Sequence, residues 1–330
     1  MLDQQARPLR DLRISVTDRC NFRCHYCMPA DIFGLNYQFL PRHEILTFEE
    51  ISRVVHLAIS LGVRKVRLTG GEPLLRRGLA DLVAMLSCID GLDDLAITTN
   101  ASLLAHRAES LALAGLHRVT VSLDALDPQI FAEMNGTGAK VERVLAGIGA
   151  ARMHGLPVKV NAVIQRGKNE SQILPLLHWG RERGITVRFI EFMDVGESNG
   201  WQKKQVVSAA EILQRVRTEF LIEQLPALYP GEVAQRWRFL DNAGEFGLIA
   251  SVTQPFCGAC NRLRLSAEGK LFTCLFAGEG RDLRARLRDG SSDNDICQFF
   301  GKTWQKRNDR FSELRGLVSG KKVEMSYLGG

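Results

Sequence analysis

Six of the eight cysteines in this chain fall into two tight groups, and grouped thiols can hold metal or carry out redox chemistry. The first group has the spacing C-x3-C-x2-C and consists of Cys20, Cys24 and Cys27. Three thiolates on one loop can hold three irons of a four-iron cluster and leave the fourth iron open. A structural zinc site needs a fourth protein ligand, for which His25 is the nearby candidate. The spacing favours an iron-sulfur cluster with one open iron.

The second group has the spacing C-x2-C-x13-C and consists of Cys257, Cys260 and Cys274. Zinc is a serious alternative here, because Cys297 could supply a fourth thiolate. Arg262 and Arg264 follow directly and alternate with leucines, so in a strand both guanidinium groups lie on one face. Such a pair suits a polyphosphate, because arginine donates two parallel hydrogen bonds to phosphate oxygens. A zinc ribbon that displays two arginines to nucleic acid has a similar pattern.

A third candidate for chemistry is Gly70-Gly71-Glu72, directly after an expected strand and before Pro73. Glycines let a ligand approach the backbone closely, while carbonyls and a carboxylate can accept from an ammonium group. Two glycines before a proline are also common in ordinary turns.

Along the chain, apolar β-branched runs alternate with stretches that have the periodicity of a helix. This pattern predicts strand-helix units around a parallel sheet, and these units position the residues above. The expected strands are 12–17, 65–69, 95–99, 118–123, 158–164 and 186–190. The expected helices are 47–61, 78–88, 103–114, 140–153, 171–183 and 208–219. Beyond residue 220 the pattern changes, which predicts a boundary between 1–220 and 221–330, with little periodicity after about residue 291.

Composition places the chain among globular proteins, with 330 residues and 45% hydrophobic content. The net charge is +6, but Lys and Arg are spread along the chain as on a solvated surface. No apolar leader is present, and no run approaches the roughly 18 apolar residues of a membrane span. We therefore expect a cytoplasmic protein with reduced thiols and no membrane or nucleic-acid partner.

Together these features resemble the molybdenum cofactor GTP 3′,8-cyclase family of the radical S-adenosylmethionine superfamily. The resemblance covers essentially the whole chain, from Leu12-Arg13-Ile14-Ser15 to Ser326-Tyr327-Leu328-Gly329-Gly330. The first cysteine group and Gly-Gly-Glu are typical of the superfamily. The second group, its following Asn-Arg-Leu-Arg and the terminal Gly-Gly mark the family.

The resemblance implies an α/β fold, a partial (βα)6 TIM-like barrel with a C-terminal segment that carries a second iron-sulfur cluster. It implies two [4Fe-4S] clusters, with S-adenosylmethionine on the first and GTP on the second. The reaction would give 3′,8-cyclo-7,8-dihydro-GTP, methionine and 5′-deoxyadenosine, the first step of molybdopterin synthesis. An electron donor and the next enzyme of that synthesis would be partners, and a homodimer is left open.

The resemblance also assigns roles by position, with no catalytic acid or base beyond the clusters. The GTP-binding positions are Arg13, Arg67, Thr98, Lys159, Arg262 and Arg264. The S-adenosylmethionine contacts are Tyr26, Gly71, Ser122 and Met193. The terminal Gly329 and Gly330 would reach into the active site. Without the resemblance, the arginines and lysine inside expected strands would be assigned to solvent.

Two positions depart from the family pattern, and two alternatives remain open. Ala101 stands where glycine is usual, so the turn there is not expected to adopt a positive φ, and Ala125 replaces a frequent serine. One alternative is a peptide-modifying radical enzyme with an auxiliary cluster, which needs a docking segment before the barrel, whereas the first strand is expected at residue 12. The other is a zinc-stabilised nucleic-acid-binding protein, whose binding would weaken steeply with salt.

Overall fold

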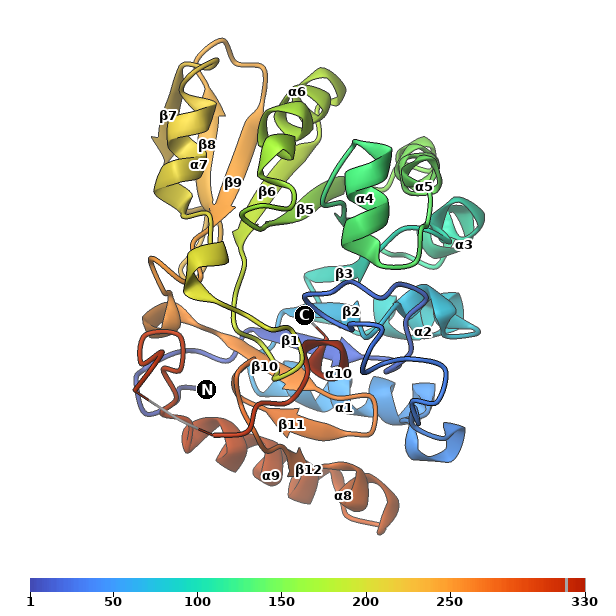
Figure 1. Ribbon diagram of the computed structural model, residues 1–330. Helices are drawn as coiled ribbons and strands as arrows, with labels where there is room; N and C mark the ends of the chain where they lie inside the picture. Colours follow the sequence, from blue (N-terminus) through green and yellow to red (C-terminus); the bar gives the residue numbers. More distant parts are fainter. Residues whose placement is uncertain (318–319, 330) are drawn as a thin grey trace.

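The computed structural model describes residues 1–317 and 320–329, and its central feature is one curved twelve-stranded sheet (Figure 1). The strand order is β12-β11-β10-β1-β2-β3-β4-β5-β6-β9-β8-β7. The strands are β1 Asp11–Ser15, β2 Lys65–Thr69, β3 Asp94–Thr99, β4 Arg118–Ser122, β5 Val158–Ile164, β6 Thr186–Glu191, β7 Ile222–Leu225, β8 Gln235–Phe239, β9 Glu245–Ile249, β10 Arg262–Leu265, β11 Lys270–Phe272 and β12 Arg281–Asp282. Strands β1 to β6 are parallel, which confirms the α/β fold expected from the sequence.

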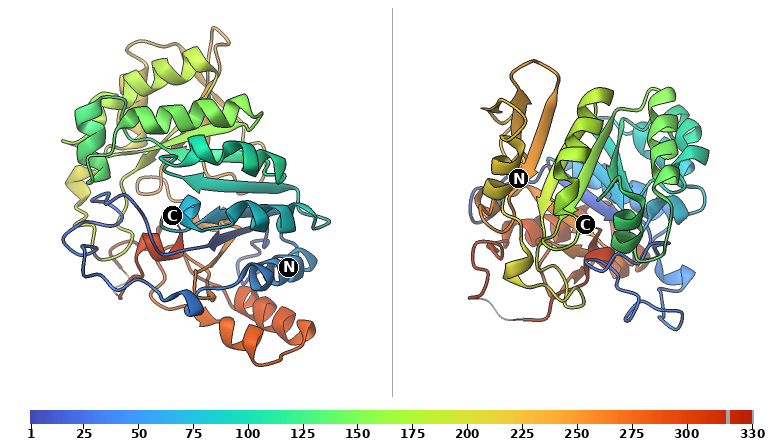
Figure 2. Two further views of the ribbon diagram at one scale, coloured as in Figure 1. Left: turned by 90° about the vertical axis from the view of Figure 1, so that its right-hand side faces the viewer. Right: turned by 45° about the horizontal axis from the view of Figure 1, so that its top comes forward.

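Helices connect the parallel strands and cover the convex face of the sheet (Figures 1 and 2). The helices are α1 Phe48–Ser60, α2 Leu79–Ser87, α3 Ala108–Leu113, α4 Pro128–Asn135, α5 Val141–Met153, α6 Ile173–Arg183, α7 Ala209–Val216, α8 Arg284–Arg288, α9 Asp293–Gln305 and α10 Met325–Leu328. The core lies between helices and sheet, and it includes Leu12 and Ile14 of β1 together with Val54 and Val55 of α1. Full burial of each such side chain stabilises the fold by about 1.5–3 kcal/mol.

Local signals start and stop the helices. Thr47 caps α1 and exchanges hydrogen bonds with Glu50, so the expected capping box is confirmed. Gly62 and Gly115 follow α1 and α3 with φ of +111° and +90°, the conformation expected after a helix end.

Four helices were not expected from the sequence, namely α4, α8, α9 and α10. Helix α4 begins with Pro128 behind the cap Asp127. Helix α9 contradicts the expected lack of periodicity after residue 291, because Ile296, Phe300 and Trp304 recur every four residues and are buried. The residues between them mix polar and apolar types, which hid this spacing.

Segments beyond residue 220 extend both ends of the same sheet. Strand β10 pairs in parallel with β1, and β9 pairs in parallel with β6. The expected boundary between 1–220 and 221–330 stays a prediction. Within the described residues, no helix is both long and apolar enough to cross a bilayer.

Candidate active site

The first cysteine group occupies the loop after the carboxyl end of β1. Its members are Cys20, Cys24 and Cys27, and the amide of Cys27 donates to the carbonyl of Cys24 at 2.9 Å. The Arg23 guanidinium donates to the carbonyl oxygens of Cys20 at 2.7 Å and Phe33 at 2.6 Å. The chain itself therefore shapes the loop that presents the three sulfurs.

The second strand end packs directly against this loop. The amides of Gly71 and Glu72 donate to the carbonyls of Thr17 and Arg19, both at 2.8 Å. A Cβ on Gly71 would lie 2.3 Å from the Arg19 oxygen and 2.9 Å from the Cys20 nitrogen. Only glycine fits this contact, so Gly71 sets the distance between the two strand ends.

The Glu72 carboxylate, which the sequence suggested as an acceptor for an ammonium group, is also a structural acceptor within the chain. Its carboxylate accepts from the Thr99 hydroxyl at 2.6 Å and from the amides of Asn100 at 2.7 Å and Leu74 at 3.0 Å. Burial raises the pKa of Glu72 to about 7. The carboxylate ties the end of β2 to the end of β3.

The donor set of the first trio fits a four-iron cluster. Burial, with a further contribution from Glu72, raises the pKa of the Cys20 thiol to about 12, and burial also raises the pKa values of Cys24 and Cys27. Iron must therefore displace these protons when it binds. His25 pairs through Nε2 with the Gln165 side chain, so the imidazole is engaged away from the thiols.

A small cavity beside this loop is lined by Tyr26, Val163, Glu191, Phe192, Met193 and Met325. The Tyr26 hydroxyl donates to Asp124 Oδ2 at 2.6 Å, and Asp124 Oδ1 accepts from the Val163 amide at 2.8 Å. Ser122 ends β4 in register with Asn161, whose buried Oδ1 lacks a hydrogen-bond partner within the described chain. The structure thus brings Tyr26 and Met193 together and places Ser122 on the neighbouring strand end.

Cationic side chains occupy the concave side of the sheet, opposite the helices. The register pairs Arg13 with both Arg67 and Arg264, so these residues lie side by side on β1, β2 and β10. Arg67 and Arg264 are 7% and 4% exposed, which rules out the solvent position that residue type alone suggests. Arg67 Nη1 donates to Thr98 Oγ1 at 3.5 Å, and Lys159 lies on β5 two strands further along.

Arg188 on β6 belongs to this cationic lumen and was missed by the sequence analysis. Its Nη2 donates to Thr120 Oγ1 at 3.5 Å. The alternation with buried Val187 and Phe189 was the available signal. Burial lowers the pKa of Arg188 to about 9 and that of Arg264 to about 10, and neighbouring guanidinium groups add to both shifts.

Hydrogen bonding inside the lumen is incomplete, and the single Asp11 carboxylate, whose buried Oδ1 also lacks a partner within the described residues, faces several cations. Within the described residues, the buried Nε atoms of Arg13, Arg67 and Arg188 have no partner. Unpaired buried donors and crowded like charges are costly unless an anion joins them. The donor set therefore fits a polyanionic ligand.

The second cysteine group lies at the amino end of β10, next to this lumen. Its members are Cys257, Cys260 and Cys274, of which the first two span a short 3-10 turn. Arg262 Nη2 lies 3.4 Å from Cys260 Sγ. Burial alone would raise the thiol pKa, but Arg262 and Arg307 outweigh it and lower the pKa of Cys260 to about 6.

The position of Cys297 does not support the alternative in which this cysteine completes a zinc site with the second trio. That residue lies on α9, with its sulfur 3.9 Å from the Ser60 hydroxyl of α1. Within residues 1–317 and 320–329, no three His, Cys, Asp or Glu side chains converge on a point that could hold one metal ion. Cluster thiolates bind separate irons and need no such convergence.

The chain end reaches the region between the two trios, where α10 contacts β1 inside the curve of the sheet (Figures 1 and 2). The Gly329 carbonyl accepts from Arg264 Nη1 at 2.5 Å. A Cβ on Gly329 would lie 1.7 Å from Thr69 Oγ1. Gly330 lies outside the described residues.

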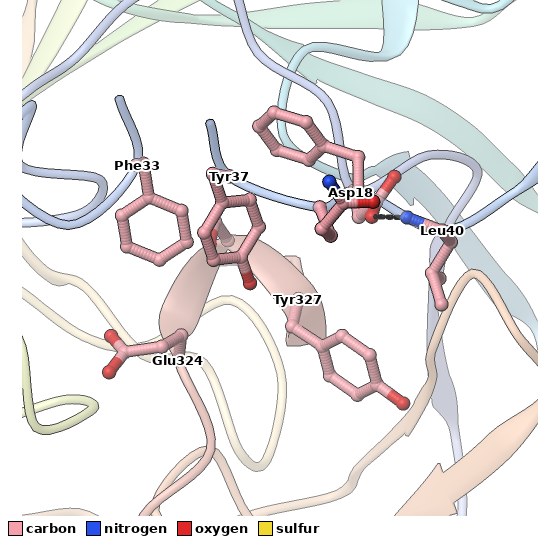
Figure 3. A pocket seen from close by; sticks show the side chains of 9 residues that line it. Asp18, Phe33, Tyr37, Leu40, Glu324 and Tyr327 are labelled. Atoms are coloured by element: carbon pink, nitrogen blue, oxygen red, sulfur yellow. Dashed lines mark hydrogen bonds between the residues drawn. The ribbon is translucent and has the colours of Figure 1, made fainter. Parts of the chain in front are cut away.

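A pocket separates α10 from the loop after β1 (Figure 3). Asp18, Tyr37 and Tyr327 line it, and Asp18 Oδ2 accepts from the Leu40 amide at 2.6 Å. The Tyr327 hydroxyl donates to Glu268, which anchors α10 on this side.

The two departures from the family pattern have different structural outcomes. The expectation for Ala101 was wrong, because Ala101 adopts φ of +58°. Such a conformation costs a non-glycine residue about 1–3 kcal/mol. The close approach of α5 at Gly147, where a Cβ would lie 2.5 Å from the Ala101 oxygen, holds the turn in place. Ala125 is fully buried among apolar side chains.

Comparison with known proteins identifies related chains. Residues 14–180 match the Radical SAM superfamily, and residues 185–313 match Molybdenum Cofactor Synthesis C. A protein of Acidothermus cellulolyticus named GTP 3′,8-cyclase is 52% identical, over 99% of this chain and 98% of that protein. Proteins of the same name from Xanthomonas axonopodis pv. citri and Staphylococcus epidermidis are 49% and 48% identical, over 100% and 99% of this chain and 99% and 98% of their own.

Solved structures show the same fold at low identity. Streptococcus suis SuiB bound to S-adenosylmethionine superposes with a TM-score of 0.63 at 18% identity, over 94% of this chain and 71% of that one. SuiB bound to the precursor peptide SuiA gives 0.64 at 17%, over 95% and 67%. Identity of 48–52% over nearly the full length shows that this chain belongs to the GTP 3′,8-cyclase family of the radical SAM superfamily.

Proposed function

We propose that this protein converts GTP and S-adenosylmethionine to 3′,8-cyclo-7,8-dihydro-GTP, methionine and 5′-deoxyadenosine. The observation that carries the proposal is the lumen of buried, partly unpaired arginines between two cysteine trios. A triphosphate supplies the anion that this lumen lacks. Family membership favours this function over both the peptide-modifying and the nucleic-acid-binding alternatives.

In this proposal the first trio, Cys20, Cys24 and Cys27, holds a [4Fe-4S] cluster. The cluster and S-adenosylmethionine, when bound, supply the 5′-deoxyadenosyl radical that takes a hydrogen from the ribose of GTP. Tyr26, Gly71, Ser122 and Met193 contact S-adenosylmethionine. Tyr26 is held by Asp124, which keeps its ring against the cofactor cavity.

The substrate occupies the lumen, with its triphosphate on the guanidinium groups. The proposed contacts are Arg13, Arg67, Thr98, Lys159, Arg262 and Arg264, to which we add Arg188. Each hydrogen bond to a charged group contributes about 1.5–3 kcal/mol, so several of them can offset the cost of crowding these cations. The second trio, Cys257, Cys260 and Cys274, holds the second cluster beside the guanine. No side chain is assigned as a general acid or base.

The proposal requires partners beyond the two substrates. An electron donor must reduce the first cluster, and the next enzyme of molybdopterin synthesis receives the product. All eight cysteines are free, which suits the reducing environment of the cytoplasm.

Anaerobic metal analysis combined with product analysis tests this function. We expect about eight irons per chain, since two four-iron clusters are held. S-adenosylmethionine should be cleaved only after reduction, and GTP should yield the cyclised nucleotide. An iron content of half that value, with zinc also bound, would show that the second trio holds zinc and would reject the second cluster. Cofactor cleavage without any cyclised nucleotide would reject GTP as the substrate.

A further inference from the structure

A buried network of four charged side chains lies behind the second cysteine trio. Its members are Asp3, Arg7, Arg307 and Asp309. The side chains of Arg7, Arg307 and Asp3 are at most 1% exposed. Arg7 Nε donates to Asp3 Oδ2 at 2.6 Å, and Arg307 Nε donates to Asp309 Oδ1 at 3.1 Å. Burial of such ions costs several kcal/mol each unless their geometry and hydrogen bonds compensate.

Both arginines of this network donate to the turn that carries the cysteines. Arg307 Nη1 donates to the Cys260 carbonyl at 2.7 Å, and Arg7 Nη1 donates to the Cys257 carbonyl at 2.9 Å. These are the first and last carbonyls of the turn between the two ligands. The network therefore fixes the orientation of both cysteines from outside the trio.

Neighbouring groups hold Arg307 in this position. Its guanidinium carbon lies 4.6 Å from the centre of the Trp304 ring. Trp304 Nε1 in turn donates to the Arg7 carbonyl at 3.1 Å. Three distant segments, at residues 3–7, 257–260 and 304–309, thus meet at one point. A guanidinium held rigidly against a ligand's own carbonyl also places a fixed positive charge beside whatever the thiolates bind.

We propose that Arg307 is a positioning residue for the second trio, which fixes the Cys257–Cys260 turn and raises the reduction potential of the cluster bound there. A nearby positive charge stabilises the reduced cluster, because reduction makes the cluster more negative. Asp309 beside Arg307 acts in the opposite direction. The inference rests on the proposed second cluster.

The test uses opposite charge changes in one full-length chain. Cys20, Cys24 and Cys27 are changed to alanine, so that only the second cluster contributes to the electron paramagnetic resonance signal. Arg307→Gln should shift the one-electron equilibrium at least tenfold toward the oxidised form, about 59 mV downward. Asp309→Asn should shift it upward. Arg183→Gln, which removes the same charge from an exposed site paired with Glu182, should leave the potential unchanged.

The opposite signs separate this role from a purely structural one. If both changes leave the potential of an assembled cluster unaltered, or shift it in the same direction, the inference is wrong. If Arg307→Gln fails to fold, Asp309→Asn decides alone, and an unshifted potential overturns the inference. If the parent chain assembles no iron at the second trio, the proposed second cluster itself is rejected, and this inference falls with it.

Discussion

The close packing of Gly329 against Thr69, called here the seat of the chain end, allows a single methyl group to test whether the chain end contributes to the reaction. In Gly329→Ala, the new Cβ would lie 1.7 Å from Thr69 Oγ1 and 3.0 Å from Thr69 Cβ. The first separation is close to a covalent bond length, so the tail must withdraw from its seat. Withdrawal breaks the hydrogen bond from Arg264 to the Gly329 carbonyl.

The size of the effect follows from two terms. Forcing a methyl group into the packed contact with Thr69 destabilises the seated state by about 1–3 kcal/mol. The φ of +68° at Gly329 adds about 1 kcal/mol or more for alanine. The sum of about 3 kcal/mol, at 1.4 kcal/mol per factor of ten, lowers the seated population by on the order of 100-fold. We expect a similar loss in the rate of GTP cyclisation.

The assay compares product formation with iron content and reductive cleavage of S-adenosylmethionine, both of which should persist in Gly329→Ala. Thr69→Ala in the same chain removes the nearest clashing atom and should restore part of the rate. Gly320→Ala is the matched control, because nothing lies within 4 Å of a Cβ there. An extension past Gly330 should act like Gly329→Ala. A Gly329→Ala rate within threefold of the parent refutes the reasoning.

Three further experiments test the first trio, the lumen and the second trio. Gly71→Ala should abolish iron binding at the first trio and cleavage of S-adenosylmethionine, because its Cβ would lie 2.3 Å from the Arg19 oxygen. Gly149→Ala is the control and should retain both properties, because nothing lies within 4 Å of a Cβ there. Arg188→Met should increase the free energy of unfolding of the ligand-free protein at pH 7.5 by about 1–4 kcal/mol, the range typical of replacing buried charges, which a higher melting temperature would report. The same change should weaken GTP binding measured by equilibrium dialysis. Below pH 9 the charged form of Arg188 destabilises the fold fully, since burial lowers its pKa to about 9, and the gain from Arg188→Met should fade as pH rises above 9. In iron-free protein, mass spectrometry should find Cys260 alkylated first, with a half-maximal rate near pH 6, because Arg262 and Arg307 lower its pKa; equal labelling of the trio at pH 7 contradicts this.

The positions of the parallel strands along the chain were predictable, because apolar periodicity is a local property of the sequence. The strands Lys65–Thr69 and Val158–Ile164 were predicted with the bounds that the structure has. Helix α9 was not predicted, since its buried residues Ile296, Phe300 and Trp304 are separated by residues of mixed character, and the helix packs against α1, far away in the chain. The positive φ of Ala101 was also missed, because residues other than glycine rarely adopt it, and the close approach of α5 to this turn is visible only in the folded chain.

For the site, residue type and spacing identified both thiol trios. The direction in which each charged side chain points could be known only from the folded chain. His25 and Cys297 were chemically possible metal ligands until Gln165 and Ser60 were found beside them. The alternation around Arg188 showed that it could face a lumen, but only the folded chain places its guanidinium beside Thr120.

The sequence by itself determined the six parallel strands and most of the helices between them, the two sets of thiols and the family, because short-range spacing encodes all three. Only the tertiary structure decided that arginines from strands distant in sequence lie side by side and that Gly329 packs against Thr69. The same holds for the hydrogen bonds from Arg7 and Arg307 to the carbonyls of Cys257 and Cys260. The physical reason is that these contacts join residues far apart in the chain, and curvature and register of the sheet, rather than local composition, bring them together.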